Sequence, residues 1–135
     1  MKNNRLISFI LVSFVYIVSI TVGIVIYNSL NFHFAINLLI ADVTATIVVF
    51  IFSLLFKNAS TYDPYWSVQP IVILVGFFII SSKSIVQILP LIVVLIWGIR
   101  LTINWSYTFK NLNHEDWRYR MLKEKTNVFY PIINF

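Results

Sequence analysis

The chain contains no cysteine, and its 135 residues include only three glycines and few charged side chains. Without cysteine, disulfide bonds and thiolate chemistry are excluded. Charged residues make up 11% of the chain, against about 25% in an ordinary soluble domain. Hydrophobic residues make up 59%. This combination is typical of a polytopic membrane protein.

Metal and nucleic-acid sites are not expected. The two histidines, His33 and His114, are far apart in the sequence, and a zinc site usually takes three or four ligands from closely spaced residues. The lysines and arginines lie beside apolar runs, as they do in the flanks of membrane spans, rather than in a basic soluble segment.

Four segments are long enough to cross a membrane, because crossing takes about 20 helical residues. The predicted spans are residues 6–27, 34–56, 64–82 and 85–107. The first run is longer than the apolar core of a cleaved signal peptide, about 7–15 residues, so we expect it to be retained.

The third span depends on a start signal upstream of its apolar run. Asp63 is predicted to cap the helix, with Pro64 at the first helical position, where a missing N–H is tolerated. Pro70 lies inside this span and is expected to kink it.

A short helix is predicted after the spans, over about residues 115–126, with Asn113 as its cap. Trp117 and Met121 share one face of it, and this face rests either on the bilayer or on the spans. The predicted fold is therefore all-α: one membrane domain, residues 1–135, with four transmembrane helices and a short cytoplasmic amphipathic helix.

The positive charges favour one orientation of the spans, because lysine and arginine concentrate in cytoplasmic loops. With a cytoplasmic N-terminus, Lys83 is the flanking basic residue left outside. The residues then inside are Lys2, Arg5, Lys57, Lys110, Arg118, Arg120, Lys123 and Lys125. We therefore expect both termini in the cytoplasm.

Arg100 lies within the fourth span, where a charged side chain needs a partner or a wet cavity. Trp97, Arg100, Asn104 and Tyr107 are spaced by three, four and three residues, which places them on one helical face. This face is expected to look into the helix bundle; the alternative is that Arg100 snorkels to the cytoplasmic interface.

Asp42 is the second charge within a span. Its depth differs from that of Arg100 by about 10 Å, which is too far for a direct hydrogen bond. Asp42 is therefore expected either to be protonated and bonded locally, as with Thr46, or to contact a polar cavity.

The segment Tyr62–Ser67 combines aromatic side chains, including Tyr65 and Trp66, with Asp63. It is either a belt at the membrane interface or part of a site. In the predicted orientation it lies at the cytoplasmic face, together with Arg100 and the arginines of the last helix. Arginines bind phosphate and aromatic rings stack on flat rings, so a cytoplasmic nucleotide is a candidate ligand.

Three segments resemble the bacterial DUF1295 membrane proteins, which belong with the steroid 5-alpha-reductase C-terminal domain group. They are NASTYDPYWSV at 58–68, LIWGIRLTINW at 95–105 and HEDWRY at 114–119. The resemblance implies NADPH-dependent reduction of a carbon–carbon double bond beside a carbonyl, in a lipid or steroid-like substrate. It places five residues near the cofactor: Arg100, Asn104, Asp116, Arg118 and Tyr119. Asp42, Asp63, Tyr65 and Trp66 are assigned to a substrate or structural site, and no catalytic residue is identified.

The sequence departs from that family in one respect. Family members continue into further spans that carry an Arg-rich stretch and an Asn-Tyr-Phe-Gly-Glu-like motif of the cofactor site. The chain is therefore expected to be a truncated front half that is inactive alone and needs a second half or a second copy. The alternative is a small non-enzymatic membrane protein that acts through helix packing or partner binding.

Overall fold

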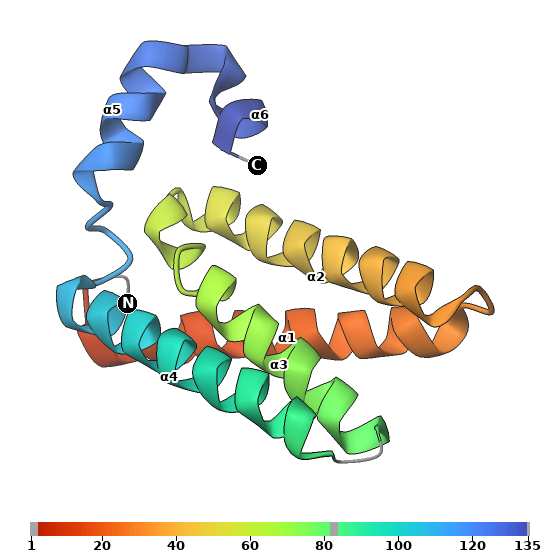
Figure 1. The fold of residues 1–135 in the computed structure, drawn as a ribbon. Coiled ribbons are helices and arrows are strands. Elements are labelled where there is room, and N and C mark those ends of the chain that lie inside the picture. The colour runs from red at the N-terminus through yellow and green to blue at the C-terminus, as the bar shows by residue number, and fades with distance from the viewer. Residues whose placement is uncertain (1–2, 82–83, 135) are drawn as a thin grey trace. The chain divides into compact units, whose positions relative to one another are not determined.

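The computed structural model describes residues 3–81 and 84–134, and within these ranges every regular element is a helix. Figure 1 shows their order along the chain. The elements are α1 (Arg5–Ser29), α2 (Phe34–Phe56), η1 (Ala59–Thr61), α3 (Tyr65–Ile80), α4 (Ile85–Thr108), α5 (Trp117–Thr126), η2 (Asn127–Phe129) and α6 (Tyr130–Asn134).

Four of these segments are long and apolar enough to cross a membrane: Arg5–Ser29, Phe34–Phe56, Ala59–Ile80 and Ile85–Thr108. The predicted all-helical fold with four spanning segments is confirmed, and the second span has the predicted bounds. Three residues used in the sequence predictions, Lys2, Ser82 and Lys83, lie outside the described ranges. The chain is a multi-pass membrane protein by the length and composition of these helices.

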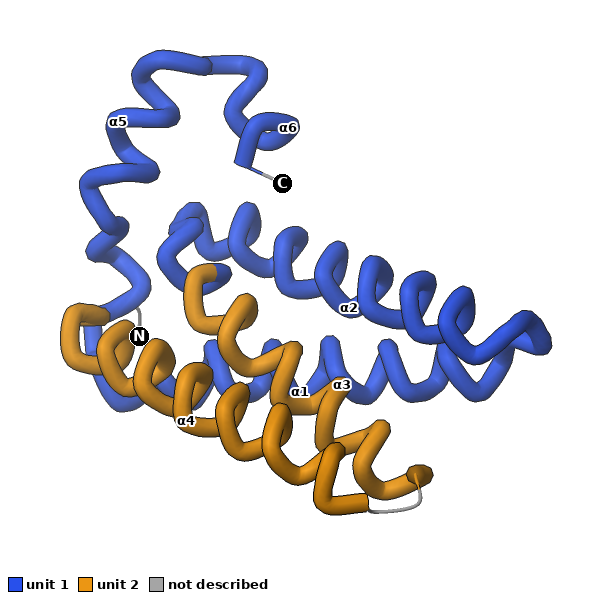
Figure 2. The backbone as a smooth tube through the Cα atoms, in the orientation of Figure 1, with its two compact units in different colours: residues 1–62, 111–135 blue, residues 63–110 orange. Residues whose placement is uncertain are grey.

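The helices divide into two compact units, coloured separately in Figure 2. Unit 1 comprises Met1–Tyr62 and Asn111–Phe135, and unit 2 comprises Asp63–Lys110. Unit 1 is thus built from two stretches of chain that flank unit 2 in the sequence.

In unit 1, α1 and α2 form an antiparallel hairpin whose buried positions are mostly small residues (Figure 1). A β-carbon at Gly23 would lie 3.4 Å from the Cβ atom of Ala45, which is ordinary contact distance. Small residues let membrane helices approach closely and gain van der Waals contact. The buried residues are Ser8, Val12, Val15, Ser19 and Gly23 of α1, and Asn37, Ala41, Ala45, Thr46, Val49 and Ser53 of α2.

In unit 2, α3 and α4 meet at Gly98. A β-carbon there would lie 2.6 Å from the carbonyl oxygen of Ser67 and 2.6 Å from Ile71 Cδ1, so only glycine fits without a shift. One turn further along α4, the Thr102 and Ser67 hydroxyl groups are hydrogen-bonded at 2.9 Å. This contact holds the two helices together at one end of the pair.

The start of α3 differs from the prediction. The helix begins at Tyr65 with Pro64 as its cap, and no side chain caps it, so the predicted Asp63 cap is wrong. Asp63 belongs instead to the turn that follows η1, and the N–H of Ser67 bonds to the Pro64 carbonyl at 3.1 Å. Pro70 lies inside α3 as expected.

Candidate functional site

The end of α2 turns sharply at Lys57, whose φ of 57° is left-handed. The N–H of Lys57 bonds to the Leu54 carbonyl at 3.0 Å, and that of Asn58 to the Ser53 carbonyl at 3.0 Å. Such a left-handed residue satisfies the last carbonyls of a helix. It also turns the Asn58 side chain inward, where 1% of the residue is exposed.

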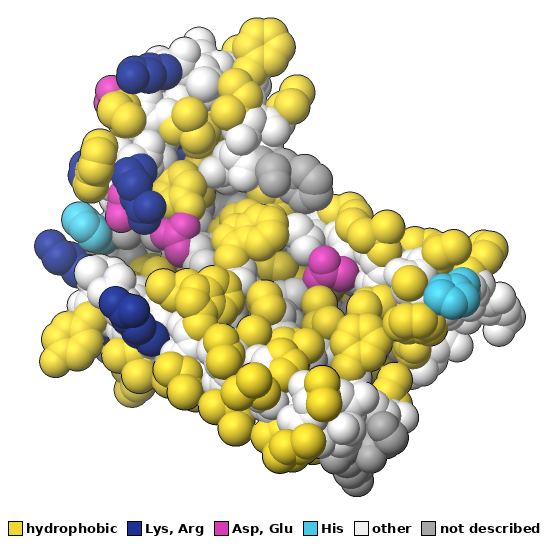
Figure 3. All heavy atoms as spheres, in the orientation of Figure 1, with side chains coloured by type: hydrophobic (Ala, Val, Ile, Leu, Met, Phe, Trp, Pro, Cys, Tyr) yellow, Lys and Arg dark blue, Asp and Glu magenta, His cyan; other side chains and the backbone are white. Residues whose placement is uncertain are grey.

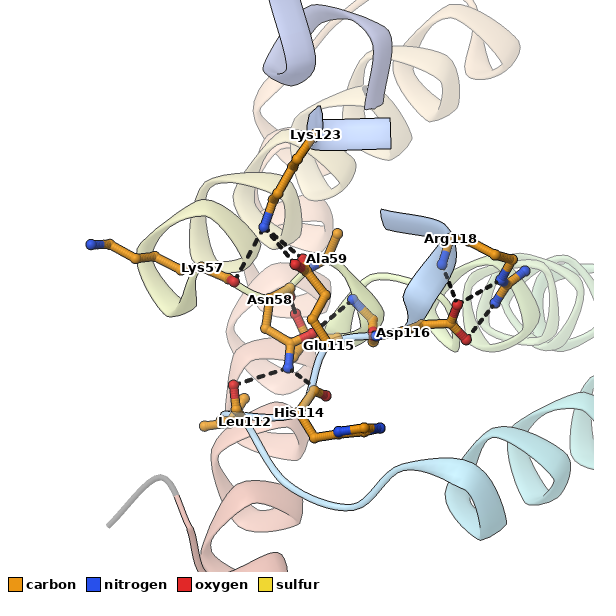
Figure 4. A network of polar contacts seen from close by, with 11 residues as sticks. Lys57, Asn58, Ala59, Leu112, His114, Glu115, Asp116, Arg118 and Lys123 are labelled. Atoms are coloured by element: carbon orange, nitrogen blue, oxygen red, sulfur yellow. Dashed lines mark hydrogen bonds and ion pairs between the residues drawn. The ribbon is translucent and has the colours of Figure 1, made fainter. Parts of the chain in front are cut away.

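Asn58 joins this turn to the segment that precedes α5 (Figure 4). Its Nδ2 donates to the carbonyl oxygens of Leu112, at 2.9 Å, and His114, at 3.1 Å. Its Oδ1 accepts from the N–H of Ser60 at 3.0 Å. Both ends of the amide are therefore used, which a carboxylate or an apolar side chain of the same size cannot reproduce.

Glu115 and Ser60 extend the connection. One carboxylate oxygen of Glu115 accepts from the Ala59 N–H at 2.8 Å, and the Ser60 hydroxyl accepts from the Asp116 N–H at 2.8 Å. The Lys123 ammonium lies 2.7 Å from the Glu115 carboxylate, whose side chain is 10% exposed. The Lys123 Nζ atom also donates to the Lys57 carbonyl at 3.4 Å.

We refer to this cluster as the Asn58 junction. Its contacts tie α5 to the end of α2 across more than 50 intervening residues. It comprises Lys57, Asn58, Ala59, Ser60, Leu112, His114, Glu115, Asp116 and Lys123.

Asp116 caps α5, so the predicted Asn113 cap is wrong. The Asp116 carboxylate accepts from the backbone N–H of Arg118 at 2.9 Å. It also accepts from the Arg118 guanidinium, at 3.0 Å from Nε and 3.3 Å from Nη2. The hydrogen bond from the Arg118 side chain lowers the pKa of Asp116 below its ordinary value. Asn113 lies in the preceding turn, where its own N–H bonds to the side chain of Asn111.

Arg118 and Tyr119 are also brought together, with the guanidinium carbon 5.9 Å from the centre of the tyrosine ring. The Arg118 side chain is 59% exposed although it is paired. Three of the five residues predicted near a cofactor, Asp116, Arg118 and Tyr119, therefore form one cluster at the start of α5.

The other two, Arg100 and Asn104, lie one turn apart on α4 in unit 2, and both are exposed. Gly98 and Thr102 face α3, and Arg100, two residues from each, lies about 160° of helical rotation from both. Within unit 2, the Arg100 face therefore points away from α3.

The aromatic segment is divided between the two units. In unit 2, Tyr65 is 1% exposed and Trp66 is 55% exposed, and their rings meet edge to face at 6.4 Å. In unit 1, the Tyr62 ring packs edge to face on Phe50 at 6.1 Å. Asp42 is half-buried on α2 and lies within electrostatic reach of the Tyr62 phenol, an interaction that the sequence did not indicate.

A cavity of about 270 Å³ lies beside the junction. Small-molecule pockets usually enclose about 300–1,000 Å³, so this one is too small for a dinucleotide. Among the described residues, none of the five predicted near a cofactor lines it. Its lining residues are Ser53, Leu54, Lys57, Asn58, Ala59, Lys123 and Tyr130. This cavity is therefore not an NADPH pocket by itself.

Sequence reasoning missed the roles of Asn58, Ser60, Glu115 and Lys123. One local signal was present, since Asn58 directly follows an apolar run that ends in lysine, which is typical of a turn. Its partners carry no comparable signal, because they are distant in the sequence.

Comparison with known proteins gives a family but no closer relative. No protein with a curated description and no solved structure matches the chain. The family model for DUF1295, described as a protein of unknown function, matches residues 49–134. This range runs from the end of α2 to α6 and contains the whole Asn58 junction. The chain therefore belongs to the DUF1295 family.

Proposed function

We propose that this chain is part of an NADPH-dependent membrane reductase, which reduces a carbon–carbon double bond beside a carbonyl in a lipid or steroid-like substrate. The proposal is supported by the likeness of three segments to the steroid 5-alpha-reductase group. Its main structural support is the Asp116–Arg118–Tyr119 cluster, which the Asn58 junction ties to the end of α2.

This cluster has the chemistry of a nucleotide contact. A carboxylate that binds a guanidinium fixes the direction in which the planar group points. Such a group recognises phosphate through paired hydrogen bonds. More than half of the Arg118 side chain is accessible, and Tyr119 places an aromatic ring beside it. When bound, the cofactor would supply hydride, and the protein's part is to bind and orient it.

The cluster is also incomplete as a cofactor site. Asp116 already balances the charge of Arg118, and the cavity beside the Asn58 junction is smaller than a dinucleotide requires. We therefore propose that this chain is not active alone, and that a second half or a second copy completes the site. The distribution of lysine and arginine supports a cytoplasmic position for the cluster and for both termini.

The experiment measures NADPH binding and turnover by the purified full chain in detergent. NADPH fluorescence should report weak binding that Arg118→Ala reduces. Arg120→Ala, which removes the same charge from the same helix, is the matched control and should leave the binding unchanged. No NADPH oxidation is expected with an α,β-unsaturated ketone lipid. Equal binding by Arg118→Ala and the unmodified protein would refute the cofactor contact, and turnover by the chain alone would refute the need for a second part.

A non-enzymatic role in helix packing or partner binding is the second candidate. The observation that favours it is the Asn58 junction itself, in which amide, carboxylate and ammonium groups bond to one another and to the backbone. This role predicts that Arg118→Ala and Arg100→Leu both leave folding unchanged, that NADPH does not bind, and that the chain forms a defined oligomer. Light scattering of the purified protein in detergent measures the last property.

A further inference from the structure

The two faces of α5 differ in exposure and in chemistry. One face carries Tyr119, Leu122, Lys123 and Thr126, and all four are partly buried. On this face Lys123 bonds to Glu115, and its ammonium lies 5.0 Å from the centre of the Tyr130 ring. This is the face that α5 turns toward the rest of unit 1.

The opposite face of α5 exposes an apolar ridge. Trp117 and Met121 lie one turn apart on it, 63% and 41% exposed. Such an exposed tryptophan on a helix is typical of a contact surface rather than of a face in water. Lys123, on the other face of α5, contacts Glu115, Tyr130 and the Lys57 carbonyl, while Trp117 and Met121 stay exposed.

Basic side chains flank the ridge on both sides. On a helical projection Arg120 lies about 60° to one side of Trp117, and Lys125 and Arg118 lie about 80–100° to the other. All three are exposed. Figure 3 shows dark-blue and yellow side chains intermingled over the part of unit 1 that holds α5. Glu124, also exposed, is the acidic residue on this face within α5.

Exposed apolar side chains continue beyond α5. Val128 and Phe129 of η2 are 80% and 66% exposed, and Ile132 and Ile133 of α6 are 76% and 55% exposed. The surface therefore combines an aromatic and aliphatic strip with cations that can snorkel from its edges. Lipid headgroup layers accept this combination, because the apolar side chains enter the acyl boundary while the cations meet phosphate.

We propose that this face of α5 docks on the anionic headgroup layer of the membrane that holds the spans. Charge complementarity selects the partner. Asp116 balances the charge of Arg118, and the exposed Arg120 and Lys125 outnumber the exposed Glu124, which favours anionic over zwitterionic lipid. Each lysine or arginine near such a surface favours the docked state by about fivefold. Docking does not depend on the proposed reductase activity.

The absence of cysteine from the sequence makes a site-specific test straightforward. A nitroxide is attached at Met121→Cys, on the ridge, and at His114→Cys, an exposed residue before α5, as the matched control. The full chain is reconstituted in phosphatidylcholine vesicles, and in vesicles with a third of that lipid replaced by phosphatidylglycerol. Paramagnetic resonance then compares collision of each label with oxygen, which enriches in lipid, and with a water-soluble nickel chelate.

The Met121 label should move from water to lipid when phosphatidylglycerol is present, and molar salt should reverse the change because it screens exposed charges. The label at position 114 should stay in water. Adding Arg120→Gln and Lys125→Gln should lower the ratio of docked to undocked α5 by about 30-fold, and Glu124→Gln should raise it. These two arginine and lysine substitutions leave Arg118, the proposed cofactor contact, unchanged.

Two results would overturn the proposal. A Met121 label that stays in water in both lipids would mean that the face does not dock. A label that is shielded equally in both lipids and in detergent would mean that protein covers the ridge, from unit 2 or from a second copy, or that it inserts regardless of lipid charge.

Discussion

The contact of α3 with α4 at Gly98 gives a prediction with a worked magnitude. In Gly98→Ala, the new methyl group would lie 2.6 Å from the Ser67 carbonyl oxygen and 2.6 Å from Ile71 Cδ1. The isoleucine end can rotate, but the carbonyl is backbone, so the two helices must move apart. Separation also weakens the hydrogen bond between Ser67 and Thr102.

The expected cost follows from these two effects. Overpacking typically costs about 1–3 kcal/mol, and a weakened hydrogen bond adds about 0.5–1.5 kcal/mol. Replacing a helical glycine by alanine stabilises the helix by about 0.5–1 kcal/mol, which offsets part of this cost. We therefore expect the free energy of unfolding to fall by about 1–3 kcal/mol, measured by SDS titration of the protein in dodecyl maltoside.

Two other glycines provide controls. Gly76→Ala in α3 meets nothing within 4 Å and should be neutral or slightly stabilising. Gly23→Ala makes an ordinary 3.4 Å contact with Ala45 Cβ and should also be close to neutral. If Gly98→Ala is as stable as Gly76→Ala, the close approach of the helices at Gly98 is wrong.

Three further predictions concern the junction, its pH dependence and the orientation. Asn58→Asp keeps the size of the side chain but cannot donate to the Leu112 and His114 carbonyls, so the free energy of unfolding should fall by about 2–4 kcal/mol in the same SDS titration. The exposed change Asn113→Asp should have little effect. Equal stability of the two variants would contradict the junction. Because the pKa of Asp116 is lowered in the folded protein, its stabilisation is present above the ordinary carboxyl pKa of about 3.9 and is lost as the pH falls through the lowered value; the difference in melting temperature between the unmodified protein and Asp116→Asn should shrink over that range, and a difference that grows on acidification would show the wrong sign. In intact cells, an impermeant maleimide should label Asn31→Cys and Ser84→Cys, and His114→Cys only after permeabilisation; the reverse pattern would refute cytoplasmic termini.

The spans were predictable because their length and apolar composition are local properties of the sequence. The bounds of α2 were predicted to the residue, and α1 extends slightly beyond its apolar run. The start of α3 was not, since the short helix η1 holds the residues before it in a turn and leaves Asp63 outside the helix. Local capping signals alone do not distinguish these arrangements.

The candidate site was predictable only where its members are neighbours in the sequence. Asp116, Arg118 and Tyr119 lie within one turn, and the structure places them together. The hydrogen bonds of Asn58 join residues 54 and 56 positions apart. Nothing in the local pattern around Asn58 identifies Leu112 or His114 as its partners, so this part required the structure.

The same separation has a consequence for biosynthesis. When α2 leaves the ribosome, the carbonyls that Asn58 will bind have not been translated, because Leu112 follows Asn58 by 54 positions. At about 5–20 residues per second, the wait lasts roughly 3–10 seconds. During that time α3 and α4 are made, while Asn58 is exposed to water, the translocon or a chaperone. The junction thus closes only after α3 and α4 have been made, when it links the first two helices to the segment that follows α4.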